Sequence, residues 1–579
     1  PPAHDRAGGC VVPYSVTQSS TTQTQIDRRT LIAAGLASAA AAGAIALPEP
    51  AESAEAAGGS LNHFQHGVAS GDPLPDRVVI WTRVTPSADA TPGSGSGEEV
   101  LVRWEVSPTA DFGRVTARGS RQTGPDRDHT VKLDVTGLAP ESWYFYRFTY
   151  NGQTSRVGRT RTAPAADAAP ENVRFGVVSC SNLQAGWFAS YRHLAARDDL
   201  HAILHLGDYL YEYGPGEYGY GMANEDVRPH EPAHEMHTLA DYRIRHAHYK
   251  RDVDLSAAHA RLPWIVTWDD HESANDAWLL GAENNEPGEY DWIDRKTNAN
   301  QAYDEWMPLR VDGTATVETD GHLHDRIYRR LRFGNLLELS MLDLRSYRSQ
   351  QVARTDLAGV DDPDRTITGD EQLAWLKDGL LTGARWKIVG NPVMIAPVTF
   401  GALPKSLIAP VNDVTGLLPD NGIAYNVDQW DGYTADRTEL FEHIRDNAIT
   451  DTVFVTGDIH SGWACDLPYD SAVYPLGKTA GVEFVATSVT SNNLKDILGA
   501  PRRTVSLTVE GIIQTANRHV RYLNFDDHGY SVLDVTRTRA QMDWYVIGER
   551  KDSNTTATWT RSYATATGSN RLHRVTVPV

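Results

Sequence analysis

The sequence predicts an α/β protein with an all-β region in front of it. Residues 61–160 contain short strand-like runs separated by Gly, Pro and Asp, which is typical of an all-β domain. Residues 173 to about 540 alternate strand-like runs with helical stretches, which favours an α/β sandwich. The chain has 579 residues, more than one hydrophobic core usually supports, so we expect at least two domains.

The β region shows a recognisable turn and strand pattern. Strand-like runs lie at 78–82, 100–106 and 130–135, and Leu138-Ala139-Pro140 precedes the aromatic run 143–148. An aromatic strand after such a turn resembles the tyrosine corner of immunoglobulin-like sandwiches. We therefore predict an immunoglobulin/fibronectin-like β-sandwich over 61–160, with a turn at residues 66–73.

The rest of the mature chain divides into three parts. Residues 161–172 are rich in Pro and Ala and read as a linker. Residues 173–540 form the predicted α/β domain, with helices expected at 239–254, 301–309 and 371–381, and residues 541–579 supply a last strand and tail. The segment 214–237, rich in Gly, Tyr, His and Pro, is either an active-site loop or a surface loop.

The N-terminal residues 1–56 read as an export signal. Arg28-Arg29 precedes an apolar run from Ala33 to Leu47 and then the small-x-small cleavage signal 54–56. This pattern predicts export by the twin-arginine machinery and a secreted or extracytoplasmic protein; an ordinary secretory leader is the alternative. Because twin-arginine export carries folded proteins, a metal loaded in the cytoplasm could be retained outside.

Composition narrows the range of partners. The formal charge of −21 argues against electrostatic binding to nucleic acid or to an anionic membrane. Anionic substrates stay possible, because bound cations can reverse the local field. We expect a monomer.

Four apolar runs are each followed at once by residues with metal-ligand atoms. Because the carboxyl ends of strands in layered α/β folds open onto one crevice, these clusters predict a metal site assembled by the tertiary fold. The four clusters are Ser179-Cys180-Ser181-Asn182, Gly207-Asp208-Tyr209-Leu210-Tyr211, Asp269-Asp270-His271-Glu272 and Gly457-Asp458-Ile459-His460.

The donor atoms suggest the first ion. Cys180, Asp208, Tyr211 and His460 offer thiolate, carboxylate, phenolate and imidazole, a set that suits Fe³⁺ better than an alkaline-earth ion. In an exported protein Cys180 could instead form a disulfide with Cys465. Its position at a strand end among other ligand types favours a thiolate ligand.

The motifs together resemble one enzyme family. In chain order they are GVASGDPL, SCSN, GDYLYEYG, WDDHE, LDLRSYR, WKIVGNPVM and GDIHSGW, and they span almost the whole mature chain. They resemble the calcineurin-like metallophosphoesterases, and within them the PhoD-type alkaline phosphatases. The resemblance implies a metallophosphoesterase sandwich and an alkaline phosphatase or phosphodiesterase. It implies small phosphate esters as substrates, with phospholipids or polymer phosphodiesters as further candidates. Tyr211 resembles the iron-phenolate of purple acid phosphatases.

The same resemblance implies a second cation. Asp270 stands where related phosphoesterases have an Asn ligand, and Asp458 where they have a His. Oxygen in place of nitrogen suits Ca²⁺ or Mg²⁺ better than Zn²⁺, and the resemblance implies Ca²⁺, with Asp208 bridging the two ions. Asn275 and Asn391 are further candidate metal or phosphate contacts, or else buried amides that hold loops.

Two residues are predicted to act on the substrate. His271 would face the phosphate without binding metal and protonate the leaving oxygen. Arg345 would grip phosphate, unless it is structural or pairs with Asp343. The implied reaction is in-line attack on phosphorus by a metal-bound hydroxide, with no protein nucleophile.

Alternatives remain open. The first is a phosphodiesterase or phospholipase D of the same fold, which the sequence does not separate from a monoesterase. The second, from another class, is a secreted binding protein with a decayed catalytic domain, although none of the six predicted ligand positions carries an apolar residue. A purely structural metal site would need a closed coordination shell.

Overall fold

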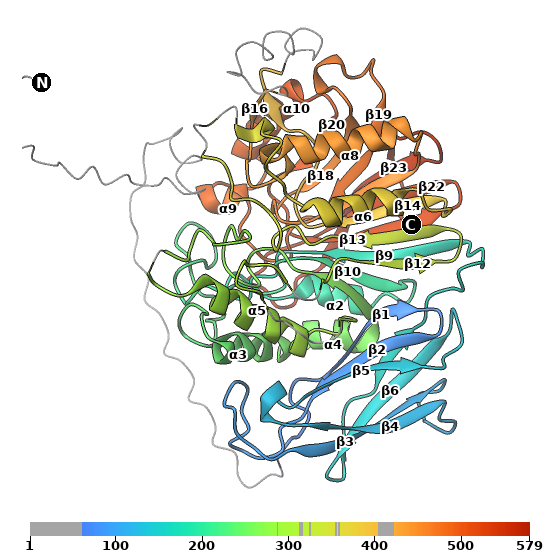
Figure 1. The fold of residues 1–579 in the computed structure, drawn as a ribbon, viewed down its shortest axis with the longest axis vertical. Helices are drawn as coiled ribbons and strands as arrows, with labels where there is room; N and C mark the ends of the chain where they lie inside the picture. Colours follow the sequence, from blue (N-terminus) through green and yellow to red (C-terminus); the bar gives the residue numbers. More distant parts are fainter. Residues whose placement is uncertain are drawn as a thin grey trace, which may run out of the picture. The chain divides into compact units, whose positions relative to one another are not determined.

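The computed structural model describes residues 61–286, 288–311, 317–323, 326–353, 356, 359–402 and 422–579, which belong to one compact unit. The predicted export signal, residues 1–56, lies outside the described residues. Figure 1 shows two central sheets with helices beside them and a further β layer at the N-terminal end of the described chain. Within the described residues, no helix is long and apolar enough to cross a membrane.

The first central sheet joins the two regions that the sequence separated. Its inner strands β9, β10 and β11 are parallel, β1 continues them in parallel, and antiparallel strands complete both edges. Among the described residues the order is β24 (Leu572–Val575), β23 (Ala557–Ala566), β22 (Arg539–Ile547), β21 (Gly529–Thr536), β9 (Asn172–Val178), β10 (Ala202–Leu206), β11 (Pro263–Thr267), β1 (Val68–Leu74), β2 (Arg77–Arg83) and β5 (Thr130–Thr136).

The second central sheet packs against the first. Strands β13, β14, β17 and β19 are parallel, and the others run antiparallel to their neighbours. Among the described residues the order is β12 (Arg329–Phe333), β13 (Leu337–Met341), β14 (Trp386–Asn391), β17 (Thr452–Thr456), β19 (Thr479–Val485), β18 (Gly462–Pro468) and β20 (Val520–Asn524). A short pair, β15 (Thr399–Phe400) and β16 (Ile423–Ala424), lies apart.

The core explains why the inner strands are apolar on both faces. Phe175 and Val177 of β9 point between the two sheets, where Phe175 meets Phe333 edge-on with ring centroids 5.3 Å apart. Val178 belongs instead to the core under the outer helices. Because both faces are covered, the strands read as continuous apolar runs. The predicted α/β sandwich is confirmed.

Helices cover the outer faces of the two sheets (Figure 1). On the first sheet lie α2 (Ala189–Ala195), α3 (Leu239–Lys250), α4 (Val253–Arg261) and α5 (Trp292–Trp306); beside the second lie α6 (Asp370–Leu380) and α8 (Thr434–Asp446). Two more, α9 (Leu494–Leu498) and α10 (Val505–Ala516), follow β19. The helix predicted at 239–254 is split, because the Asp252 side chain accepts a hydrogen bond from Leu255 N and caps a new helix.

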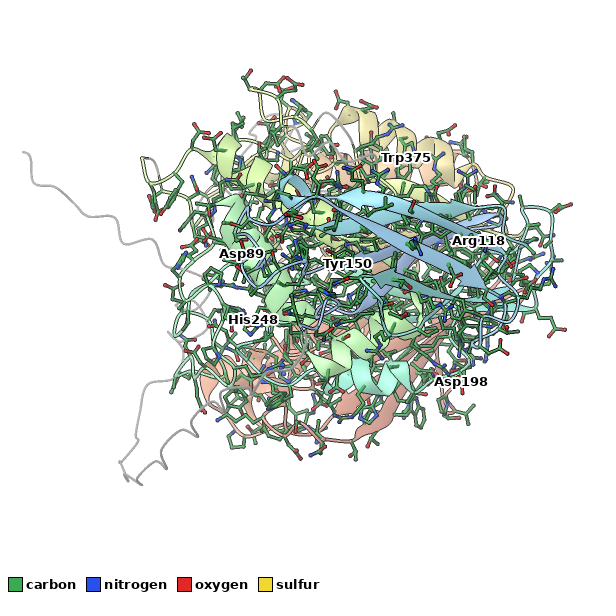
Figure 2. All side chains as sticks on the ribbon, turned by 90° about the horizontal axis from the view of Figure 1, so that it is seen from below. Asp89, Arg118, Tyr150, Asp198, His248 and Trp375 are labelled. Atoms are coloured by element: carbon green, nitrogen blue, oxygen red, sulfur yellow. The ribbon has the colours of Figure 1, made fainter. Side chains whose placement is uncertain are left out.

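The N-terminal β region is partly shared with the α/β core. A third sheet, β4 (Ala117–Thr123), β3 (Val100–Ser107), β6 (Trp143–Tyr150) and β7 (Gln153–Thr154), with β8 (Gly158–Arg161) on β6, packs on β1, β2 and β5. Figure 2 views the molecule from this side, with Arg118 and Tyr150 on the third sheet. Ala139 N donates to the Tyr144 hydroxyl at 2.9 Å, as a tyrosine corner requires. The complete immunoglobulin-like topology stays a prediction.

The predicted turn at residues 66–73 is wrong, since Val68–Leu74 forms β1. Gly71 pairs with Trp264 of β11, and a Cβ at Gly71 would lie 2.0 Å from the Pro308 carbonyl oxygen. The glycine therefore serves close packing of a buried strand and does not mark a turn. The segment 162–171 after β8 has no helix or strand, yet Ala163 is buried in the core between the sheets.

Candidate metal centre

The predicted clusters meet at one edge of the two sheets. Strands β9, β10 and β11 of the first sheet and β14, β17 and β19 of the second all end there. An isolated parallel bridge between Ser179 and Ser488 connects the loops that follow β9 and β19. Two parallel sets of strands therefore deliver their carboxyl-end loops to a common place, as the sequence predicted.

The first predicted ligand set comes together. Donor atoms of Cys180, Asp208 and His460 all lie within 4.8 Å of one another. The Tyr211 hydroxyl lies 3.0 Å from Asp208 Oδ2, to which it donates, and 3.3 Å from His460 Nε2. Thiol, carboxyl, phenol and imidazole thus face one point. We call these four residues the first-metal group.

The backbone under these ligands is unusual. Cys180, Asp208, Asp458 and His460 have φ values of 60°, 55°, 60° and 52°, in the left-handed region that residues other than Gly seldom adopt. Each such residue costs on the order of 1 kcal/mol or more and persists only where its surroundings enforce it. Four of the six predicted metal ligands carry this strain, which points to a functional constraint on the loops.

Electrostatics in the first-metal group favour a bound cation. The buried Asp208 Oδ1 has no hydrogen-bond partner in the described structure. Burial and then the Asp208 carboxylate raise the pKa of the Cys180 thiol and of the Tyr211 hydroxyl well above their ordinary values. Three acidic donors this close together cannot all ionise without a positive charge among them. The donor set fits a metal ion.

The alternative disulfide is absent, because Cys180 and Cys465 are both free and buried. Cys465 lies on β18, where it pairs with Glu483 of β19. Its proximity in sequence to His460 therefore does not place it among the ligands that the described residues bring together.

The second predicted position is less completely assembled. Donor atoms of Asp208, Asp270 and His271 lie within 4.8 Å of one another, so Asp208 is shared by both groups. The Asp270 carboxylate accepts hydrogen bonds from Asp276 N at 2.7 Å and His271 N at 3.0 Å. Asp458 accepts from Gln429 Nε2 at 3.0 Å and lies in neither group found among the described residues. We call Asp208, Asp270, His271, Arg345 and Asp458 the second-metal group.

His271 is held by a carboxylate that the sequence analysis missed. Its Nδ1 lies 2.8 Å from Glu212 Oε2, and Glu212 Oε1 accepts from Asn275 N at 2.7 Å. The ring packs on Tyr211 with centroids 4.1 Å apart. Burial alone would lower the pKa of His271, but Glu212, Asp270 and Asp208 raise it well above its ordinary value. The position of Glu212 inside GDYLYEYG was the available signal.

Arg345 is engaged by carboxylates. Its Nε and Nη2 donate to Asp269 at 2.6 and 3.1 Å, and Nη1 and Nη2 donate to Asp428 at 2.9 and 3.0 Å. The side chain is 3% exposed. Asp343, the partner considered from sequence, accepts from Arg345 N instead. With four N–H bonds already made, the predicted phosphate grip has no support in this arrangement, which favours a role in holding the loop that carries Asp270 and His271.

The two candidate asparagines differ from one another. Asn391 is fully buried; its Nδ2 donates to the Val393 carbonyl and to Thr456 Oγ1, and its Oδ1 accepts from Trp430 Nε1 at 3.1 Å. It is a loop-holding amide here. Asn275 donates from Nδ2 to Glu283. The side-chain bonds given above for Asn275 and Asn391 are thus made with residues outside the first-metal and second-metal groups.

Glu272, the last residue of the predicted cluster 269–272, supports two loops of the site. Glu272 accepts hydrogen bonds from three backbone amides, at 3.1 Å from Asp208 N, 2.6 Å from Tyr209 N and 2.8 Å from Asp269 N. It therefore ties the loop after β10 to the loop after β11. This commitment makes Glu272 a poor candidate for a proton donor.

The segment 214–237 borders the metal centre. Of the two roles that its composition suggested, active-site loop or surface loop, this position favours the active-site loop. Tyr218 stacks on Tyr211 with ring centroids 5.7 Å apart and lies 6.1 Å from the His271 ring. The Tyr218 carbonyl accepts from Asn182 Nδ2 at 2.6 Å. Aromatic side chains thus stand beside the proposed leaving-group acid.

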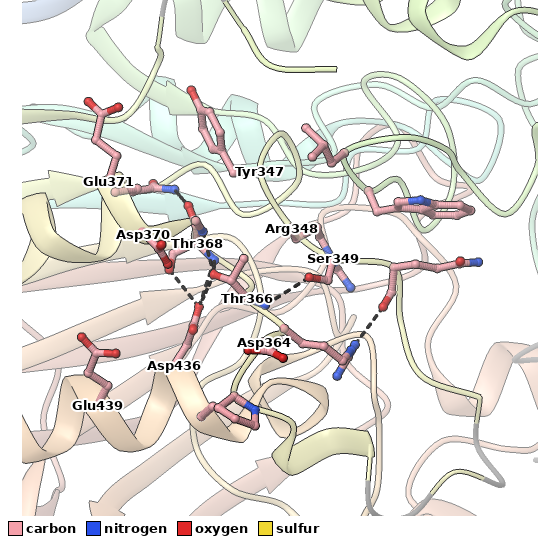
Figure 3. Close-up of a pocket in the computed structure, with 18 of the residues that line it drawn as sticks. Tyr347, Arg348, Ser349, Asp364, Thr366, Thr368, Asp370, Glu371, Asp436 and Glu439 are labelled. Atoms are coloured by element: carbon pink, nitrogen blue, oxygen red, sulfur yellow. Dashed lines mark hydrogen bonds between the residues drawn. The ribbon is translucent and has the colours of Figure 1, made fainter. Parts of the chain in front are cut away.

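A separate cavity of about 1460 Å³ lies beside Arg348 and helix α8 (Figure 3). None of the predicted site residues lines it. Arg348 does, and its Nη2 donates to Asp428 at 2.9 Å, the same carboxylate that Arg345 contacts. Asp436, at the start of α8, accepts from Thr366 and Thr368 in its wall. The cavity is therefore adjacent to the loop support of the second-metal group.

Comparison with known proteins agrees with the geometry. The family model described as PhoD-like phosphatase matches residues 175–544, and the model for the N-terminal domain of these phosphatases matches residues 50–164. Alkaline phosphatase D of Bacillus subtilis (strain 168) is 35% identical over 490 residues, 84% of this chain and 77% of that protein. A solved structure of PhoD superposes with a TM-score of 0.78 and 33% identity, over 90% of this chain and 94% of the other. Since both regions of the chain match, this protein belongs to the PhoD-like phosphatase family.

Proposed function

We propose that the protein is an exported, metal-dependent phosphatase that hydrolyses phosphate monoesters and diesters. Family membership supports the phosphatase itself. The observation that carries the metal dependence is the first-metal group, in which four donor types converge on one point while the buried Asp208 Oδ1 has no hydrogen-bond partner among the described residues.

The donor chemistry assigns the ions. Cys180, Asp208, Tyr211 and His460 would hold Fe³⁺, because thiolate and phenolate suit that ion. Asp270 and Asp458 would hold Ca²⁺ together with the shared Asp208, because hard oxygen donors suit an alkaline-earth ion. When bound, the two cations would lower the pKa of water and offset the negative charge of the phosphate.

The chain's own residues would handle the leaving group. His271 Nδ1 donates a hydrogen bond to Glu212, which leaves Nε2 as the ring nitrogen available to the Asp208 and Asp270 side. A protonated Nε2 can donate to the departing oxygen, while the ion pair with Glu212 keeps the ring in place. Arg345 and Glu272 would act on the same step indirectly, by holding the loops that carry Asp208, Asp270 and His271.

The experiment that tests this function compares substrates. Turnover of an aryl phosphate monoester, a matched diester and a phospholipid should be measured with the native metal content and after chelation. We expect activity on the monoester and the diester, loss of activity on chelation, and the best recovery with Ca²⁺. Exclusive turnover of phospholipid would favour the phospholipase D alternative. Metal binding without turnover of any ester would favour the binding-protein alternative.

Export and assembly complete the proposal. The twin-arginine pair Arg28-Arg29 would direct the folded protein out of the cytoplasm, and changing both residues to Lys should retain it inside. Export of the double variant at the normal rate would contradict this route. We propose a monomer in solution, which sedimentation at several concentrations would test.

A further inference from the structure

One loop supports three members of the first-metal group at once. Residues 490–492 follow β19, and the backbone amides of Thr490 and Ser491 both lie 3.3 Å from the Cys180 carbonyl oxygen, to which they donate. Ser491 Oγ donates to the Tyr211 hydroxyl at 2.6 Å. We call residues 490–492 the support segment.

The same segment orients His460. The Asn492 carbonyl oxygen lies 2.8 Å from His460 Nδ1. This contact fixes the ring so that Nε2 is the nitrogen directed at Tyr211 and the rest of the group. A displacement of the support segment would therefore move an imidazole, a phenol and the backbone that carries a thiol together.

A buried arginine from the other end of the chain holds this segment. Arg550 lies in the turn between β22 and β23 and is 2% exposed. Its Nη1 donates to the Thr490 carbonyl oxygen, and its Nη2 donates to Asn492 Oδ1 at 2.6 Å. Asp496, 3.1 Å from Nη2, balances the charge, and its own pKa is lowered to about 2, since His528, Arg550 and Lys495 outweigh the effect of burial.

Arg550 also reaches the loop that borders the site. Its guanidinium lies over the Tyr220 ring, 4.5 Å from the centroid. Asn492 Oδ1 accepts from Gly221 N at 2.8 Å, and Asn492 Nδ2 donates to the Gly219 carbonyl at 2.7 Å. Arg550 and Asn492 therefore join the support segment to the segment 214–237.

We propose that Arg550 is a positioning residue of the metal centre, acting through the support segment on His460 and Tyr211. The inference rests on the proposed function, because it concerns a metal-dependent site. Two N–H groups of the planar Arg550 guanidinium donate to the Thr490 carbonyl oxygen and to Asn492 Oδ1. The two bonds fix the orientation of the support segment as well as its position. A lysine ammonium can keep the charge near Asp496 but lacks this fixed geometry.

The test compares Arg550→Met and Arg550→Lys with Lys551→Met as the matched control. Lys551 adjoins Arg550 and its Nζ lies 4.4 Å from the Tyr220 centroid, yet its side chain contacts Tyr220 and Glu225, which lie outside the support segment. Fe³⁺ binding to the metal-free proteins and the visible absorption of the loaded proteins should be measured. Hydrogen exchange of residues 488–493 should be followed in the metal-free proteins.

We expect both Arg550 variants to bind iron about 10- to 100-fold more weakly, the usual effect of losing a residue that orients a ligand. Their absorption band should shift, and exchange at 488–493 should accelerate even without metal. The Lys551 variant should match the wild type in all three measurements. If Arg550→Met does not fold, Asn492→Ala removes one acceptor and keeps the carbonyl that contacts His460, and a loss of about 10-fold is expected.

Normal iron affinity, an unshifted band and unchanged exchange in a folded Arg550→Met variant would overturn the inference. Equal losses in Lys551→Met would also overturn it, since the anchoring of segment 214–237 would then explain the effect. Failure of the proposed function gives a different result: the wild-type protein itself would bind no iron and hydrolyse no phosphate ester. The exchange measurement still decides the role of Arg550 in that case.

Discussion

The first-metal and second-metal groups share Asp208 but are built differently. In the first group the donors contact one another, with Tyr211 O–H 3.0 Å from Asp208 and 3.3 Å from His460. In the second group two members are engaged outside it, Asp458 by Gln429 and Arg345 by Asp269 and Asp428. The donors of the first group thus already face one another. In the second group, Asp458 and Arg345 must either exchange partners or act indirectly, by holding other residues in place.

Charge differs between the groups as well. The first consists of donors alone, and burial raises the pKa of all three of its acids, Cys180, Asp208 and Tyr211. The second includes cations of its own, since Arg345 lies 3.6 Å from Asp270 and His271 pairs with Glu212. A resident cation is therefore needed more strongly in the first group. We expect the first ion to be retained tightly and the second to exchange more readily.

A change at Asp208, the residue that both groups share, should have the largest effect. Asp208→Asn should empty both positions and lower kcat/KM by about 10³-fold, because several kcal/mol of transition-state charge stabilisation would be lost. Metal analysis and kinetics on an aryl phosphate check this. Asp458→Asn is the matched control and should lower only the second metal. Loss of a single ion in Asp208→Asn would contradict a bridging role.

The second prediction sharpens the role of the second group. His271→Ala should lose about 10²-fold more rate on an alkyl phosphate than on an activated aryl phosphate, because a general acid matters most for a basic leaving group. Glu212→Gln should show the same dependence on leaving group, more weakly, since it weakens the partner of His271 Nδ1. Rates on the two substrates are the measurement. Equal losses would mean that His271 stabilises charge without donating a proton, and loss of metal would make it a ligand.

The sequence predicted the first group better than the second for a physical reason. Strand-end position and residue type were enough to find Cys180, Asp208, Tyr211 and His460, because parallel strands deliver their carboxyl ends to one edge. Residue type does not show which partner a long side chain takes. Asp428, which engages Arg345, is 83 residues away from it along the chain.

The same limit applies to the fold. The alternation of strands and helices predicted the α/β sandwich, because each element carries its own periodic pattern. The pairing of β1 with β11 was not visible, since a parallel contact between Gly71 and Trp264 leaves no local signal. Glu212 and Arg550 were missed for a similar reason: their roles depend on partners distant in sequence.

The third prediction concerns the loss of stability in acid, which is a separate effect from titration of the metal groups. Burial lowers the pKa of His519 from 6.5 to about 4, and its Nε2 lies 2.6 Å from the Pro397 carbonyl. The imidazole of His519 therefore binds a proton more readily in the unfolded chain than in the folded protein. The contribution of neutral His519 to the free energy of unfolding is fully present above pH 6.5 and is lost as the pH drops towards 4. The loss approaches about 3 kcal/mol from this group.

His519→Gln should therefore flatten the dependence of the free energy of unfolding on pH between 6.5 and 4. Denaturant melts at several pH values measure it. His573→Gln, which changes an exposed histidine, should leave the wild-type slope. An unchanged slope in His519→Gln would mean that other groups account for acid loss, and the pH dependence of activity would then report on the metal groups less directly.

Tyr211 is the proposed phenolate ligand of Fe³⁺ in the first-metal group. The most direct test is metal analysis and visible absorption of the purified protein beside Tyr211→Phe. We predict iron in the wild type and a charge-transfer band that disappears or shifts strongly in the variant, with lower activity. A colourless wild-type protein that is fully active and contains no iron would contradict the account.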